Sequence, residues 1–176
     1  EGPDVLLLHG AGGLDGVYDE LLARLSTSYR VHAPEWPGYG ESTGEELLED
    51  MLDFALHGWD IADALGLDRP HVIGHSMGGM IAAEMAAIAR TEVASLCLLA
   101  PAGLWLDDHP IADIFSKLPY ELPGLLFHDA EAGAKLLASG GDMNDPEFLK
   151  QFLVMNARRL GMAGKILFPI PDRGLG

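Results

Sequence analysis

Short apolar runs that alternate with segments of helical spacing constrain the fold of this chain more than any other feature. Four such runs lie at Val5–Leu8, Tyr29–Ala33, His71–Ile73 and Val93–Leu99. The first is apolar at every position, which is typical of a strand buried on both faces. Segments with helical spacing follow the first three runs, at Val17–Leu25, Glu45–Leu65 and Met77–Ala89. Because strands that alternate with helices pair in parallel, the sequence predicts an α/β fold, a mostly parallel sheet with helices on both faces.

The pattern changes after Pro101, where helical spacing recurs without intervening strands. We expect helices at Ile111–Leu118, Asp129–Ser139 and Pro146–Leu160. The last has Asp145 as its N-cap and Gly161 just past its end, which are typical boundary residues. The sequence thus predicts three parts: a sheet-containing core over residues 1–103, a helical cap or lid over 104–168, and the start of a return to the core over 169–176, with the remainder of that core absent.

Composition excludes several classes of partner. The 176 residues include 11 basic and 27 acidic side chains, a formal charge of −16, and 48% are hydrophobic, as in a globular domain. Such a charge opposes binding to nucleic acid or to an anionic membrane surface. The single cysteine, Cys97, allows no internal disulfide and no multi-cysteine metal cage. Glu1 is not followed by the basic and apolar segments of a targeting signal, so we expect a cytoplasmic protein.

The pentapeptide Gly74-His75-Ser76-Met77-Gly78 matches G-x-S-x-G. It lies between the strand that ends at Ile73 and the helix that begins at Met77, as a nucleophile elbow requires. In that strained turn a side chain at either flanking glycine would clash with its neighbours. The turn raises the serine Oγ above the sheet, at the positive end of the helix dipole. The pattern predicts that Ser76 is the nucleophile of an acyl-transfer site.

An acyl-transfer site also needs two backbone N–H donors for the oxyanion. Met77, the residue after the nucleophile, is expected to supply one. The glycine-rich loop at 9–13 follows a neighbouring strand and is placed to supply the other through Ala11 or Gly12. Glycines suit this loop because they let the backbone approach a ligand closely.

Four segments in order carry a family resemblance: His9-Gly10, Pro34–Ser42, Gly74–Gly79 and Leu98–Gly103. On these segments the chain from Pro3 to about Gly103 resembles proteins with the α/β-hydrolase fold. The resemblance implies Ser76 as nucleophile, the backbone amides of Ala11 and Met77 as oxyanion hole, and a lid from Pro101 onward. It also implies an esterase or a related hydrolase acting on a carbonyl substrate. A serine at the nucleophile position argues against epoxide hydrolases and dehalogenases, which usually carry aspartate there.

The remaining triad members of this family follow the serine in the order acid, then histidine. The chain ends at Gly176, before the strands that would carry them, so we expect both to lie outside it and turnover by these residues alone to fail. Asp107 or Asp108 with His109 or His128 satisfies the order formally, but lid residues seldom reach triad geometry. No cofactor is expected. No metal is expected either, because His71 and His75 span a strand and a turn, where residues four apart do not converge.

Three aromatic residues, Trp36, Trp105 and Phe115, are candidates for lining the pocket of a small apolar ester-like substrate, although core packing explains them equally well. Alternatives remain open. A C–C bond hydrolase of ring-fission products is favoured slightly by the glycine-rich loop after His9. A non-catalytic small-molecule-binding protein on the same fold is a second class. A dinucleotide-binding enzyme is a third class, but the glycine spacing after Val5–Leu8 departs from its fingerprint. Exposed sheet edges would also be compatible with a homo-oligomer.

Overall fold

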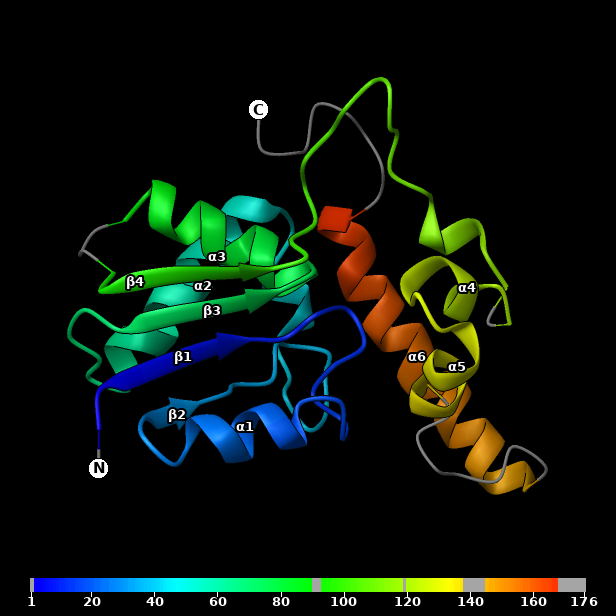
Figure 1. Ribbon diagram of the computed structural model, residues 1–176, viewed down its shortest axis with the longest axis horizontal. Coiled ribbons are helices and arrows are strands. Elements are labelled where there is room, and N and C mark those ends of the chain that lie inside the picture. The colour runs from blue at the N-terminus through cyan, green and yellow to red at the C-terminus, as the bar shows by residue number, and fades with distance from the viewer. Residues whose placement is uncertain (1, 90–92, 119, 138–144, 168–176) are drawn as a thin grey trace.

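The sheet in the computed structural model is parallel throughout, as predicted (Figure 1). The structure describes residues 2–89, 93–118, 120–137 and 145–167. The strand order is β2-β1-β3-β4, with the four strands at β1 (Asp4–Leu8), β2 (Arg30–His32), β3 (His71–His75) and β4 (Ser95–Leu99). Parallel pairing aligns Val5 with His71 and His71 with Ser95. The carboxyl ends of β1 and β3, which lead into the glycine-rich loop and into Ser76, are therefore neighbours.

Helices cover both faces of the sheet, which confirms the predicted fold class. α2 (Met51–Ala64) and α3 (Met77–Ala87) lie behind the strands in Figure 1, and α1 (Asp19–Leu25) lies in front of β2. The side chains of Leu6, Leu8 and Val72 point to the α2–α3 side and belong to the main hydrophobic cluster. Val5 and Leu7, which alternate with them on β1, are equally buried on the other face.

The helix predicted over Glu45–Leu65 begins later than expected. Glu45–Leu47 forms one 3₁₀ turn, η1, and the chain is extended at Leu48, whose side chain is buried. α2 then begins at Met51, with the Asp50 side chain accepting hydrogen bonds from the N–H groups of Leu52 (2.9 Å) and Asp53 (3.1 Å). A strong N-cap and a buried leucine together divide the acidic segment into two elements.

The cap segment, defined here as residues 104–167, differs most from the predictions. Instead of a helix over Ile111–Leu118 it has a single 3₁₀ turn, η2 (Ile114–Ser116), whose N-cap Asp113 accepts from the N–H of Phe115. The structure adds a short helix that was not predicted, α4 (Leu122–Leu126), and it confirms a helix near 129–139 as α5 (Ala130–Leu137). The residues expected to begin a return to the core, 169–176, lie outside the described residues.

The last helix, α6 (Pro146–Leu167), continues past Gly161, where the sequence predicts its end. The reason is tertiary packing: Met162, Ala163 and Ile166 are buried in the main hydrophobic cluster, which stabilises the additional turns. Figure 1 shows α6 beside the carboxyl ends of the strands, with α4 and α5 on its far side. Asp145 accepts a hydrogen bond from the N–H of Glu147 at 3.0 Å, as the predicted N-cap should.

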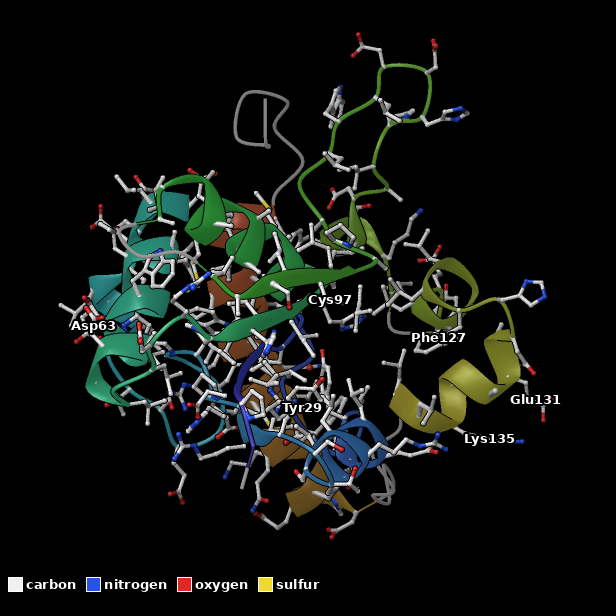
Figure 2. All side chains as sticks on the ribbon, turned by 60° about the vertical axis from the view of Figure 1, so that its left-hand side comes forward. Tyr29, Asp63, Cys97, Phe127, Glu131 and Lys135 are labelled. Atoms are coloured by element: carbon white, nitrogen blue, oxygen red, sulfur yellow. The ribbon has the colours of Figure 1, made fainter. Side chains whose placement is uncertain are left out.

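The outer cap helices are lightly packed. Figure 2 shows Glu131 and Lys135 projecting from α5 away from the sheet, where they form an ion pair at 3.0 Å. On the inner side of α5 the ring of Phe127 lies against Gly133. Among the described residues, no helix has the length and apolar character needed to cross a membrane.

Candidate active site

Ser76 occupies a strained turn between β3 and α3. Its φ of 53° and ψ of −116° lie in a region that residues with a side chain rarely adopt. Four backbone hydrogen bonds hold it there. Its N–H donates to the carbonyl of Leu99 (3.0 Å), and its own carbonyl accepts from Gly79 (3.0 Å), Met80 (3.1 Å) and Ala102 (3.0 Å). The turn is therefore held by both β4 and the first turn of α3, and the Ser76 side chain remains only half-buried.

The glycines that flank Ser76 are required by close backbone contacts, as the motif predicts. A Cβ on Gly74 would lie 2.7 Å from the Ala82 Cβ, and one on Gly78 would lie 2.5 Å from the carbonyl carbon of Leu8. Real Cβ atoms essentially never approach other atoms this closely. Any larger residue would separate α3 from the sheet and thereby move the serine.

The loop that follows β1 lies directly against this turn. A Cβ on Gly10 would be 3.2 Å from the Ser76 Cβ. The loop closes with a hydrogen bond from the N–H of Gly13 to the carbonyl of Gly10 at 3.1 Å, and Gly13 has a φ of 84°. Ala11 is half-buried and Gly12 is exposed. The hydrogen bonds among the described residues include none donated by the N–H groups of Ala11 or Met77.

His9 connects this loop to the turn that follows β2. Its ring is fully buried, with Nδ1 2.7 Å from the Gly10 carbonyl oxygen and Nε2 3.2 Å from the Trp36 backbone nitrogen. The carbonyl can only accept and the amide can only donate, so the neutral ring carries its proton on Nδ1. Burial lowers the pKa of His9 to about 4, which favours this neutral form. His9 is thus a bracing residue rather than a base for Ser76.

The other histidines are engaged elsewhere or lie in the cap segment. His75 contacts the Tyr18 hydroxyl, His71 contacts Ser95, and His32 contacts Asp4. All seven histidines of the chain are described, and none makes a hydrogen bond to the Ser76 hydroxyl. No group of three or more His, Cys, Asp or Glu side chains among the described residues is arranged to hold a metal ion.

The predicted pocket residues occupy three different environments. Trp36 is fully buried, with its ring 5.8 Å from those of Phe54 and His57. Trp105 is half-buried and donates from its indole nitrogen to Asp107 at 3.0 Å. Phe115 is partly buried against the main hydrophobic cluster. A contact of any of the three with substrate stays a prediction.

The sequence analysis did not identify Arg159, a cation on α6 that lies beside the loop after β1. Arg159 is 6% exposed and forms an ion pair with Asp15. Its guanidinium carbon would lie 3.3 Å from a Cβ on Gly13, and its backbone carbonyl accepts from the Tyr39 hydroxyl at 3.2 Å. The sequence holds no signal for this position, because Arg158 next to it is the same residue type and pairs at the surface with Glu45.

This geometry can be compared with known proteins. A family model described as the alpha/beta hydrolase fold matches residues 3–138, which contain the sheet, the glycine-rich loop and the Ser76 turn. The chain belongs to the α/β-hydrolase family.

Two curated proteins with similar sequences are named as hydrolases. The chain is 33% identical over 132 residues to the 2-hydroxy-6-oxo-6-phenylhexa-2,4-dienoate hydrolase of Burkholderia cepacia, which covers 72% of this chain and 44% of that protein. It is 31% identical over 115 residues to the pimeloyl-[acyl-carrier protein] methyl ester esterase of Aeromonas salmonicida, which covers 62% of this chain and 43% of that protein. The matches thus span less than half the length of these relatives.

A solved esterase structure has a similar fold. The naproxen esterase of Bacillus subtilis superposes with a TM-score of 0.61 at 27% identity, over 89% of this chain and 54% of that one. The similarity thus extends over most of this chain and about half of that one.

Proposed function

We propose that the protein carrying this chain is a serine hydrolase that cleaves an ester or related carbonyl substrate through an acyl-enzyme on Ser76. The observation that carries the proposal is the strained backbone of Ser76, held by four hydrogen bonds at the start of α3. Strain of this kind persists only where the surrounding structure enforces it, and it is concentrated at functional sites. A hydroxyl raised out of the end of a strand and only half-buried is accessible to a substrate carbonyl.

In this mechanism the Ser76 oxygen attacks the carbonyl carbon while a general base takes its proton. The tetrahedral intermediate collapses when the alcohol leaves with a proton, and water then hydrolyses the acyl-enzyme. The N–H of Met77 and that of Ala11 or Gly12 would hold the oxyanion. The contact between Gly10 and Ser76 supports this assignment, because it brings the two donor segments to the same side of the serine.

The substrate class proposed is a small apolar ester. Two similar proteins, the pimeloyl-[acyl-carrier protein] methyl ester esterase and the naproxen esterase, are named for ester hydrolysis. Trp36, Trp105 and Phe115 remain candidates for its pocket. The charge of −16 supports a small-molecule substrate rather than nucleic acid. Cytoplasmic location and self-association are part of the same proposal.

A second candidate activity is the cleavage of a C–C bond in a dienoate. It is favoured by the 33% identity to the 2-hydroxy-6-oxo-6-phenylhexa-2,4-dienoate hydrolase. Both activities would use the same serine and the same oxyanion donors, so the elbow alone does not separate them. The two activities can be separated by measuring turnover of a p-nitrophenyl ester and of a 6-oxo-dienoate, each normalised to the number of active sites.

Labelling with a fluorophosphonate tests the proposal. The intact gene product carrying this chain should react once, at Ser76, and Ser76→Ala should abolish both labelling and ester turnover. Ser95→Ala is the matched control, because Ser95 is exposed at the start of a neighbouring strand, where its hydroxyl lies 2.8 Å from Nδ1 of His71. Labelling that survives Ser76→Ala would overturn the assignment of the nucleophile. A folded protein that never labels would instead support a non-catalytic binding role.

A further inference from the structure

Tyr18 connects the two segments that flank the proposed reaction site. It directly precedes α1, and its side chain is 5% exposed. The N–H of Gly10 donates to the Tyr18 hydroxyl oxygen at 2.9 Å, and that oxygen lies 2.6 Å from Nδ1 of His75. Gly10 immediately precedes Ala11, and His75 immediately precedes Ser76. One phenol therefore bonds the neighbour of an oxyanion donor and the neighbour of the nucleophile.

The chemistry of the groups fixes the direction of the first hydrogen bond: a backbone N–H can only donate, so the Tyr18 oxygen accepts from Gly10. This leaves the phenol proton available to His75 Nδ1, which accepts it in the neutral tautomer that carries its ring proton on Nε2. Burial lowers the pKa of His75 and raises that of Tyr18. Both shifts favour the neutral forms that this arrangement requires.

The loop after β1 and the Ser76 turn, which Tyr18 connects, lie close together. A Cβ on Gly10 would lie 3.2 Å from both the His75 Nδ1 and the Ser76 Cβ, so the loop and the elbow are in direct contact. Gly10 is buried, and loss of the phenol oxygen would leave its N–H without an acceptor, which costs free energy unless the loop moves. A movement of the loop that recovers this cost changes the distance of Ala11 and Gly12 from Ser76.

We propose that Tyr18 is a positioning residue whose hydroxyl sets the distance between the oxyanion loop and the Ser76 elbow. The proposal rests on the serine-hydrolase function proposed above. It concerns the transition state specifically, because oxyanion donors act on charge that develops only after attack. Removal of the hydroxyl should therefore lower kcat and leave KM nearly unchanged.

The test is Tyr18→Phe in the intact gene product, with p-nitrophenyl butyrate as substrate and rates expressed per Ser76 titrated by a fluorophosphonate. We expect kcat to fall by on the order of 100-fold, as displacements of about 1 Å in an active site do, with KM within about twofold of its original value. Tyr29→Phe is the matched control, since Tyr29 packs on His71 at the opposite end of the sheet, where β3 and β4 begin. It should retain kcat.

A second pair of variants keeps the proposal testable if Tyr18→Phe does not fold. His75→Gln offers a carbonyl oxygen to the Tyr18 proton and should retain more kcat than His75→Leu, which offers none. Unchanged kcat in Tyr18→Phe, or equal loss in both His75 variants, would overturn the role of Tyr18 while Ser76→Ala still abolished turnover. Absence of Ser76-dependent turnover in the unmodified protein would overturn both proposals together.

Discussion

The sheet region, residues 2–103, and the cap segment differ in how their helices are held. α3 in the sheet region buries seven of its residues, whereas α4 and α5 in the cap segment each bury one, Pro123 and Gly133. Ser76 and the proposed oxyanion donors belong to the sheet region, whereas two of the candidate pocket residues, Trp105 and Phe115, belong to the cap segment. The comparison indicates that the sheet region fixes the position of Ser76 and that the outer cap helices are free to vary without moving it.

α6 is lightly packed along its first half and densely packed along its second half. In its first half Phe148 and Phe152 stack on each other, while Leu153 and Val154 are more than half exposed. In its second half Met162, Ala163 and Ile166 are buried in the main hydrophobic cluster. Its cations also reach the sheet region there: the Lys165 ammonium donates to the carbonyls of Glu45 at 2.6 Å and Leu48 at 2.5 Å. The second half of α6 therefore packs as part of the sheet region, although it lies in the cap segment of the sequence.

The strongest test of this comparison uses two glycines, one in each region. Gly78→Ala places a Cβ against the carbonyls of Leu8 and His9, so we expect it to lower the free energy of unfolding by about 4 kcal/mol. Gly124→Ala in the outer cap helix α4, whose Cβ would meet nothing within 4 Å, should instead raise it by about 0.5 kcal/mol through helix propensity. Urea unfolding measures both. Equal effects would show that the two regions are packed alike.

The two halves of α6 give the next largest contrast. Ile166→Ala removes a side chain that is 3% exposed and leaves a cavity in the main cluster, at a cost of about 3 kcal/mol. Leu153→Ala, at a side chain that is 57% exposed, should change stability by less than about 0.5 kcal/mol. Thermal unfolding followed by circular dichroism reports the difference. A large loss in Leu153→Ala would place the first half of α6 in a packed environment after all.

The same contrast explains what sequence reasoning reached and what it did not. In the sheet region the alternation of strands and helices predicted the parallel sheet, and the G-x-S-x-G motif predicted the turn at Ser76, although α2 begins later than predicted. Local rules failed at Gly161, where the buried turn after it outweighs an ordinary stop signal. They also failed for Tyr18 and Arg159, because the partners of these side chains lie far away in the chain and no spacing rule links them.

Acid should weaken the sheet region through His9. The pKa of this histidine is about 4 in the folded protein, against 6.5 as the ordinary value, because its ring is buried. The unfolded chain therefore binds more protons between these values, so the stabilisation is complete above pH 6.5 and is lost as the pH falls toward 4. We expect a loss of roughly 2 kcal/mol at pH 5 relative to pH 7.5.

Urea unfolding at the two pH values measures this loss, and His9→Gln provides the control. The variant has no imidazole to protonate, so its stability should change less between pH 7.5 and pH 5 than that of the unmodified chain. The half-buried histidines His57 and His75, whose pKa values are also lowered by desolvation, contribute a remainder of the same sign in both proteins. An unchanged pH dependence in His9→Gln would assign the loss to those other groups.

The smallest effects are expected when the N-cap residue of one helix in each region is replaced. Asp50 caps α2 through the N–H groups of Leu52 and Asp53, and α2 packs within the main cluster, so Asp50→Ala should lower the free energy of global unfolding by about 1 kcal/mol. Asp145 caps α6 through Glu147, but the turn it holds buries little. Asp145→Ala should therefore let that end of α6 fray locally, with a global loss below about 0.3 kcal/mol and faster amide exchange confined to its first turns. Equal global losses in the two variants would mean that the exposed half of α6 unfolds cooperatively with the sheet, and the separation between the two regions would then fail.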